Sequence, residues 1–314
     1  DQNLENSLSD SITIIDNRSG ESVEIPIVDG GVDSSPWTKL LPGLWFKDEG
    51  FAATAVTNSS ITFIDGGAGR LEYRGYPIEQ LANNSSFLEV SFLLLNGELP
   101  DQNQLASWEE TIAEVSDLDP NHHDSLLQAF KEDSHPMGML TSALAALSSL
   151  HPDSRNVEDP EVRAKHTINL IAKIPSIAAA AENFRNGRSS QPYRLNLSYT
   201  ENFLAGIYGN GDDEYVPEPI FTKALEQLFI LHADHEQNCS TTAVRVVGSA
   251  HADPYSAIAA GSAALSGPRH GGANEAVINM LDEIETLENV DAFVDSVKKG
   301  DDLLWGFGHR VYKN

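Results

Sequence analysis

Cysteine and long apolar runs are nearly absent from this sequence of 314 residues. Its single cysteine, Cys239, excludes an internal disulfide framework and a cysteine-based metal cluster, and this usage is typical of a reducing compartment. No apolar run approaches the roughly 20 residues that span a bilayer. Residues 1–10 lack the basic and then apolar pattern of a secretion signal. We therefore predict a soluble, cytoplasmic, globular protein with no membrane partner.

Positive charge is also scarce. Lys and Arg number 20 against 47 Asp and Glu, which gives a formal net charge of -27 at pH 7. Such a surface repels a phosphate backbone, so we predict no nucleic-acid partner, and an anionic ligand needs a local cationic pocket. The acidity also suggests adaptation to high salt, where screening weakens self-repulsion. A stability optimum at low salt would contradict that hypothesis.

The spacing of apolar residues predicts a short β region followed by a mainly α fold. Ile and Val alternate with polar residues on both sides of a turn at 17–20, which predicts a hairpin, and 60–65 is a second β-like run. Helical periodicity then predicts helices over 137–150, 160–173, 176–185, 217–236, 254–265 and 274–287. Ser86 with Glu89 is a capping box, and Asp253 before Pro254 is a second helix start. The polar stretch 185–196 is predicted to be a loop.

Histidines form three clusters in the last third of the chain, and the first contains His232 and His235. The apolar stripe of the preceding helix, continued in steps of three and four, reaches both histidines and Cys239, which predicts that they face inward. Buried polar groups need partners or a ligand. They are either core histidines bonded to backbone carbonyls or part of a metal site, although the zincin order of residues is missing.

The second cluster is His270, followed by Gly271 and Gly272 directly before a predicted helix. Glycines allow close approach to the backbone, and a helix N-terminus offers N–H groups to negative charge, as an enolate or thioester oxygen requires. The third cluster places His309 and Arg310 in a glycine turn, where they could bind a small carboxylate and polarise its carbonyl. For His270 the alternative is a tight turn with an incidental histidine. For His309 and Arg310 it is a surface turn with solvated charges.

Several further motifs accompany these clusters in a fixed order. They are Ile61-Thr62-Phe63-Ile64-Asp65-Gly66, Tyr73-Arg74-Gly75-Tyr76-Pro77-Ile78, Leu95-Asn96-Gly97-Glu98-Leu99-Pro100 and Asp133-Ser134-His135-Pro136-Met137. Together with the histidine clusters they resemble the citrate synthase family. The N-terminal hairpin resembles the small β region of its hexameric bacterial branch, type II.

The resemblance implies a mainly α, two-domain multihelical fold with a short N-terminal β hairpin region. We expect a β-rich region at 1–60, a large helical domain at 61–265 and the start of a small domain at 266–314. An active site built between two domains implies that the small domain closes over the substrates as a lid. The expected assembly is a dimer, and in the bacterial branch a trimer of dimers.

The activity implied by the resemblance is condensation of acetyl-CoA with oxaloacetate and water to citrate and CoA. Acetyl-CoA is then a co-substrate, with no tightly bound cofactor and no metal. The implied site residues are His270 and His309 as catalytic groups, His235 and Arg310 as oxaloacetate ligands, and Gly306, Phe307 and Gly308 as CoA contacts. Arg269 stands where relatives usually place a small or apolar residue, and it either contacts a CoA phosphate or faces solvent. NADH inhibition is not predicted, because the residues around 114–119 differ from those of NADH-sensing relatives.

The family's catalytic base is an aspartate well past the third histidine cluster, and the chain continues for five residues after His309. We therefore expect a C-terminally truncated chain that lacks activity by itself. One alternative is 2-methylcitrate synthase acting on propionyl-CoA, since one methylene changes discrimination by only about 1–3 kcal/mol. Two other classes are a metal-dependent hydrolase using His232, His235 and His270, and a non-catalytic helical scaffold.

Overall fold

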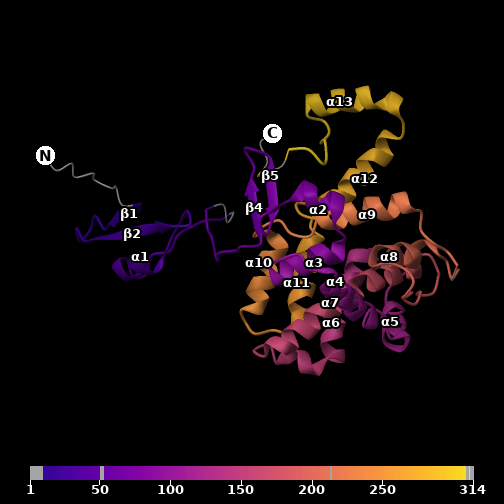
Figure 1. Ribbon diagram of the computed structural model, residues 1–314. Helices are drawn as coiled ribbons and strands as arrows, with labels where there is room; N and C mark the ends of the chain where they lie inside the picture. Colours follow the sequence, from indigo (N-terminus) through magenta and orange to yellow (C-terminus); the bar gives the residue numbers. More distant parts are fainter. Residues whose placement is uncertain (1–9, 50–52, 213, 309–310, 312–314) are drawn as a thin grey trace. The chain divides into compact units, whose positions relative to one another are not determined.

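The computed structural model describes residues 10–49, 53–212, 214–308 and 311 (Figure 1). The chain divides into two compact units, Asp1–Ser59 and Ser60–Asn314. The described residues form thirteen α-helices and two small antiparallel sheets, which confirms the predicted mainly α fold with a β hairpin near its start.

The first unit is built on the predicted hairpin. Strands β1 (Ser11–Ile15), β2 (Ser22–Val28) and β3 (Gly31–Val32) pair in that order, and α1 (Ser35–Leu40) follows. The alternating residues meet across the strands, with Ile12 opposite Ile25. Ile25 and Trp37 are buried, and the Trp37 ring meets Phe46 edge-on with ring centroids 4.3 Å apart. These contacts give the unit a small core of its own.

The second unit opens with the other sheet, formed by β4 (Thr62–Asp65), β5 (Arg70–Tyr73) and β6 (Tyr76–Pro77). The predicted β run from residue 60 is therefore confirmed. Tyr73 at the end of β5 is fully buried, and its hydroxyl donates to the carbonyl of Asp234 at 2.9 Å. The sheet thus holds the segment that carries the first histidine cluster.

Helices make up most of the rest of this unit. They are α2 (Ile78–Asn84), α3 (Phe87–Asn96), α4 (Gln102–Glu114), α5 (Pro120–Leu127), α6 (Pro136–Leu150), α7 (Pro160–Arg185), α8 (Tyr199–Tyr208), α9 (Pro219–Leu231), α10 (Cys239–Gly248), α11 (Pro254–Leu265), α12 (Gly272–Ile284) and α13 (Val290–Lys299). The capping box of Ser86 and Glu89 is present, and Asp253 accepts the Ser256 N–H, so both predicted helix starts are confirmed. None of the helices in the described ranges has the length and apolar character needed to cross a membrane.

The predicted break near Pro175 is wrong, because 160–173 and 176–185 belong to one helix, α7. Proline has no N–H, so the carbonyl of Ile171, four residues earlier, loses its helical partner. The hydroxyl of Tyr199 donates to that carbonyl at 2.7 Å. A tertiary hydrogen bond therefore replaces the helical one, and α7 continues through the proline.

The prediction of a helix to residue 236 is also wrong, because α9 ends at Leu231. The Nδ1–H of His232 donates to the carbonyl of Leu228 at 2.8 Å, and the His232 side chain is exposed. Cys239 is exposed as well. The helical stripe does not extend past Leu231, so the prediction that His232 and Cys239 face inward fails for this reason.

The principal core lies between α6, α7 and α11, and α10 packs against α11 (Figure 1). The buried core residues are Ala143, Leu144, Leu147, Leu170, Ile177, Tyr255 and Ala259. Gly261 lets α10 and α11 approach closely, since a Cβ there would stand 2.7 Å from the Val244 side chain. This contact sets the start of α10 relative to the end of α11, where the candidate site lies.

Candidate active site

His270 lies in the tight turn between α11 and α12. Its backbone N–H donates to the carbonyl of Gly267 at 2.9 Å. A Cβ on Gly271 would overlap the Leu265 side chain, and a Cβ on Gly272 would stand 2.8 Å from the Gly267 carbonyl oxygen. The turn folds back on the end of α11 too closely for any side chain at either position. The glycines therefore hold the histidine in a rigid, tightly packed turn.

The ring of His270 is held by Ser240 in the first turn of α10. The Ser240 backbone N–H donates to Nε2 at 3.4 Å, and the Ser240 hydroxyl lies 2.7 Å from the same atom. A backbone N–H can only donate, so Nε2 is an acceptor and the ring proton lies on Nδ1. Burial, and secondarily the nearby His235, lower the pKa of His270. The geometry therefore favours a neutral imidazole with an Nδ1–H donor.

His235 lies in the connection between α9 and α10 and is partly buried. Asp234 fixes this connection, since its carboxylate accepts hydrogen bonds from the Thr62 hydroxyl and, at 3.2 Å, from the Glu236 N–H. Glu236 adopts a left-handed φ of 54°, which reverses the chain ahead of α10. The contact of Ser240 with His270 brings the segment that follows the first histidine cluster to the second cluster, and His235 is the lesser cause, after burial, of the lowered pKa of His270.

The third cluster is described only in part, because His309 and Arg310 lie outside the described residues. Gly306 and Gly308 have φ values of 87° and 76°, which favour glycine. A Cβ on Gly306 would stand 3.2 Å from the Val277 side chain of α12, so this turn packs beside the helix that follows His270. Phe307, by contrast, is 74% exposed, and Arg269 is exposed too.

Ser240 is the site residue that the sequence analysis missed. Helix α10 was not predicted, although Asn238 is a favourable N-cap residue, and its side chain accepts the Thr241 N–H. That cap was the available signal for a helix start beside the first histidine cluster. The pairing of Ser240 with His270, 30 residues away, has no counterpart in sequence spacing.

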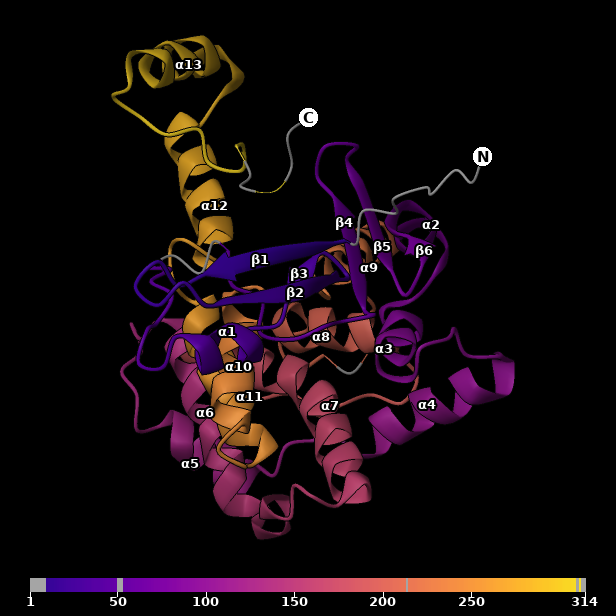
Figure 2. The same cartoon turned by 90° about the vertical axis from the view of Figure 1, so that its left-hand side faces the viewer.

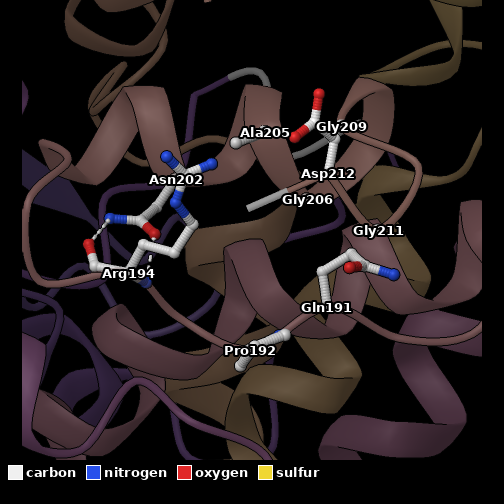
Figure 3. A pocket seen from close by; sticks show the side chains of 9 residues that line it. All are labelled: Gln191, Pro192, Arg194, Asn202, Ala205, Gly206, Gly209, Gly211 and Asp212. Carbon is white, nitrogen blue, oxygen red and sulfur yellow. Dashed lines mark hydrogen bonds between the residues drawn. The ribbon is translucent and has the colours of Figure 1, made fainter. Parts of the chain in front are cut away.

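Two hollows lie away from these histidines, and both are too small for a substrate. The first, between α8 and the loops on both sides of it, has a volume of about 10 Å³ and is shown in Figure 3. Arg194 and Asn202 exchange hydrogen bonds along its wall. The second, about 20 Å³, lies beside Pro175. Each has room for about one water molecule.

Within the described ranges, no three His, Cys, Asp or Glu side chains are grouped so that they could hold a metal ion. The metal-dependent hydrolase alternative required His232, His235 and His270 to converge. His232 is exposed and bonded to its own helix, so nothing in these ranges supports that alternative.

The multihelical fold is shared with a known class of proteins. The chain belongs to the citrate synthase family, because the family model described as "Citrate synthase, C-terminal domain" matches residues 50–314. It is 44% identical to a citrate synthase of Dictyostelium discoideum over 100% of this chain and 64% of the relative. It is also 44% identical to a peroxisomal citrate synthase of the same organism, over 97% of this chain and 64% of the relative. The chain thus spans less than two thirds of these relatives.

Solved structures agree with this assignment. The citrate synthase of Pyrobaculum aerophilum is 35% identical, with a TM-score of 0.75 over 84% of this chain and 66% of that protein. The enzyme of Thermoplasma acidophilum, solved as a ternary complex with carboxymethyl coenzyme A and oxaloacetate, is 30% identical. Its TM-score is 0.74 over 85% of this chain and 68% of that protein.

The prediction of a cytoplasmic location is contradicted by the names of relatives. One Dictyostelium relative is named peroxisomal, and a relative from Cucurbita maxima, 43% identical over 97% of this chain and 61% of its own length, is named glyoxysomal. The prediction relied on the pattern of apolar and basic residues as well as on cysteine usage, and cysteine usage reports a reducing environment without distinguishing among compartments that share it.

Proposed function

We propose that the protein containing this chain condenses acetyl-CoA with oxaloacetate and water to form citrate and CoA. The observation that carries the proposal is the fixed tautomer of His270. Its Nε2 accepts from Ser240, so its Nδ1–H is available to donate to a substrate oxygen. Membership of the citrate synthase family supports the same reaction.

The chemistry explains why a neutral donor is needed at this position. Carbon–carbon bond formation from a thioester starts with removal of a weakly acidic methyl proton by a carboxylate base. That step requires a positioned donor to stabilise the negative charge developing on the thioester oxygen. The Nδ1–H of His270 fulfils this role, and the lowered pKa keeps the ring neutral near pH 7. The rigid turn and Ser240 set the ring before the substrate arrives.

The other roles are proposed on the resemblance of the motifs. His235 binds oxaloacetate or citrate, and its proximity contributes, after burial, to the lowered pKa of His270. His309 polarises the oxaloacetate carbonyl, and Arg310 binds a carboxylate. Gly306, Phe307 and Gly308 contact the CoA adenine, and the exposed Arg269 is free to meet a CoA phosphate.

The larger organisation is proposed on the same basis. The β-rich region spans 1–60, the large helical domain 61–265 and the small domain begins at 266. Self-association gives dimers, assembled as a trimer of dimers if the chain is of the hexameric bacterial branch. The support for that branch is the N-terminal β unit. Sedimentation or light scattering of the natural protein distinguishes the dimer from the hexamer.

The deciding experiment is oxaloacetate-dependent release of the CoA thiol. The natural gene product that contains these residues is assayed with acetyl-CoA, with and without oxaloacetate, and the 314-residue polypeptide is assayed beside it. We expect release by the gene product only when oxaloacetate is present, and none by the 314-residue polypeptide. Propionyl-CoA in place of acetyl-CoA tests the 2-methylcitrate alternative. Absence of oxaloacetate-dependent release from the gene product would refute the proposal.

A further inference from the structure

An ion pair joins the start of α6 to the start of α12. The His135 Nε2 lies 3.1 Å and 3.3 Å from the two carboxylate oxygens of Glu275. His135 is the N-cap residue of α6, and Glu275 lies in the first turn of α12. The two residues are 140 positions apart, so the contact is a tertiary link.

The tautomer of His135 is set by its capping role. Its Nδ1 accepts the backbone N–H of Met137 at 3.1 Å, so a neutral ring carries its proton on Nε2. That proton points to Glu275. The link is therefore a hydrogen bond to a carboxylate when His135 is neutral and an ion pair when it is charged, and it persists in both forms.

The link joins the packed helices that carry Ser240 to helix α12, which follows His270. Both must keep their positions for His270 to contact Ser240. Helix α6 packs against α11, and α11 against α10, which carries Ser240. Helix α12 begins at Gly272, two residues after His270, and runs away from those packed helices (Figure 2). In addition to the close packing of the Gly271–Gly272 turn, the His135–Glu275 contact therefore joins the first turn of α12 to the packed helices.

The pair contributes little to global stability. The side chains of His135 and Glu275 are 52% and 57% exposed, and half-exposed pairs of this kind contribute only about 0–1 kcal/mol. What the link restricts is the position of one helix turn. In an enzyme, displacement of a reacting group by about 1 Å can cost about a hundredfold in rate.

We propose that His135 and Glu275 are positioning residues, which hold the first turn of α12 so that the His270 ring stays in register with Ser240. The consequence for catalysis rests on the proposed citrate synthase activity. The consequence for the structure, a tethered first turn of α12, does not depend on it.

The test uses two variants that break the link from opposite ends. His135→Asn keeps a good N-cap residue on α6 but is too short to reach Glu275, and Glu275→Ala leaves the cap untouched. The matched control is His122→Ala. His122 pairs with Asp119 at 2.8 Å with similar exposure, 54% and 51%, but this contact is local to the start of α5. All variants, and the double variant His135→Asn/Glu275→Ala, are made in the natural protein.

Two measurements separate position from stability. Hydrogen exchange of residues 268–278 reports on the first turn of α12, and kcat at saturating acetyl-CoA and oxaloacetate reports on the register of His270. We expect faster exchange and a kcat lowered by roughly tenfold in both single variants, with unchanged Tm. The double variant should be no worse than the single ones, because both remove one interaction. His122→Ala should match the wild type.

Two results would overturn the proposal. Exchange over 268–278 that is unchanged in both link variants would show that the pair tethers nothing, and a kcat equal to that of His122→Ala would show that the tether does not position His270. If the wild-type protein shows no condensation at all, the proposed function fails, and the exchange measurement alone then decides whether the tether exists.

Discussion

The backbone N–H and the hydroxyl of Ser240 both meet Nε2 of His270, at 3.4 Å and 2.7 Å. One small residue thereby determines the tautomer of the ring and its direction. Since Ser240 belongs to the first turn of α10, the register of that helix and the reactivity of the histidine are coupled. A displacement of α10 would therefore alter the donor that the candidate active site presents.

Ser240→Ala tests the hydroxyl contact. The variant keeps the backbone N–H but loses the shorter contact to Nε2, so the ring is held less firmly. We expect kcat to fall by roughly tenfold, corresponding to about 1.4 kcal/mol, with little change in KM for acetyl-CoA. The control is Ser249→Ala at the other end of α10, whose hydroxyl donates to the Val246 carbonyl of its own helix. Equal kcat values for the two variants would contradict the assigned role.

The pKa of His270 gives a pH-dependent prediction. Burial lowers that pKa first and His235 second, so the ring stays neutral to a lower pH than an ordinary histidine, whose pKa is about 6.5. A histidine whose pKa is lower in the folded protein than in the unfolded chain makes its full contribution to the free energy of unfolding at pH values above the unfolded pKa. That contribution is lost as the pH falls below about 6.5. His235→Gln removes the smaller cause, so the pKa of His270 should rise yet stay below the ordinary value. NMR titration of the imidazole measures it, and a pKa that does not change would contradict the proximity of the two rings.

The close packing of α10 on α11 gives a prediction about stability. Gly261→Ala places a Cβ 2.7 Å from the Val244 side chain, so we expect a loss of about 1–3 kcal/mol in the free energy of unfolding. Gly248→Ala, in open space at the end of α10, should be neutral or stabilising by up to about 1 kcal/mol. Urea titration measures both.

A second substitution checks the cause of that loss. Val244→Ala removes the methyl groups that a Cβ at position 261 would meet, so Gly261→Ala should cost less in a Val244→Ala background than in the wild type. An equal cost in both backgrounds would mean that the strain at Gly261 has another origin.

The bond between Tyr199 and Ile171 explains how α7 passes through Pro175, and it is testable by a double-mutant cycle. Tyr199→Phe leaves the Ile171 carbonyl without its donor, at a cost of about 1–3 kcal/mol. Pro175→Ala restores an N–H four residues after that carbonyl. In the Pro175→Ala background the Tyr199→Phe substitution should therefore cost much less. A cost that is the same in both backgrounds would refute this account of the helix.

The local parts of the fold could be predicted because their causes lie within a few residues. The hairpin follows from alternation around a polar turn, the Ser86–Glu89 capping box from two side chains three residues apart, and α11 from Asp253 and Pro254 at its start. Helix boundaries that depend on partners distant in sequence were missed. Pro175 predicts a break, and the hydroxyl of Tyr199 supplies the hydrogen bond to Ile171 that the proline cannot.

In the candidate site, too, the features with local causes could be predicted and those that depend on distant partners could not. Glycines around His270 mark a tight turn ahead of a helix, and the order of the motifs identifies the family. The inward orientation predicted for His232 failed, because α9 ends one residue before it and the helical periodicity does not continue. Sequence spacing gave no sign of the pairing of His270 with Ser240 or of His135 with Glu275.

By itself, then, the sequence determined the helical class and the family, and it predicted which side chains react. These follow from short-range patterns and from residue types that the chemistry requires. Only the tertiary structure decided which nitrogen of His270 carries the proton, which groups lower its pKa, and which contact tethers α12. The position of the proton and the tether depend on hydrogen bonds between atoms that helix packing brings together, and the pKa depends on the burial that the same packing produces.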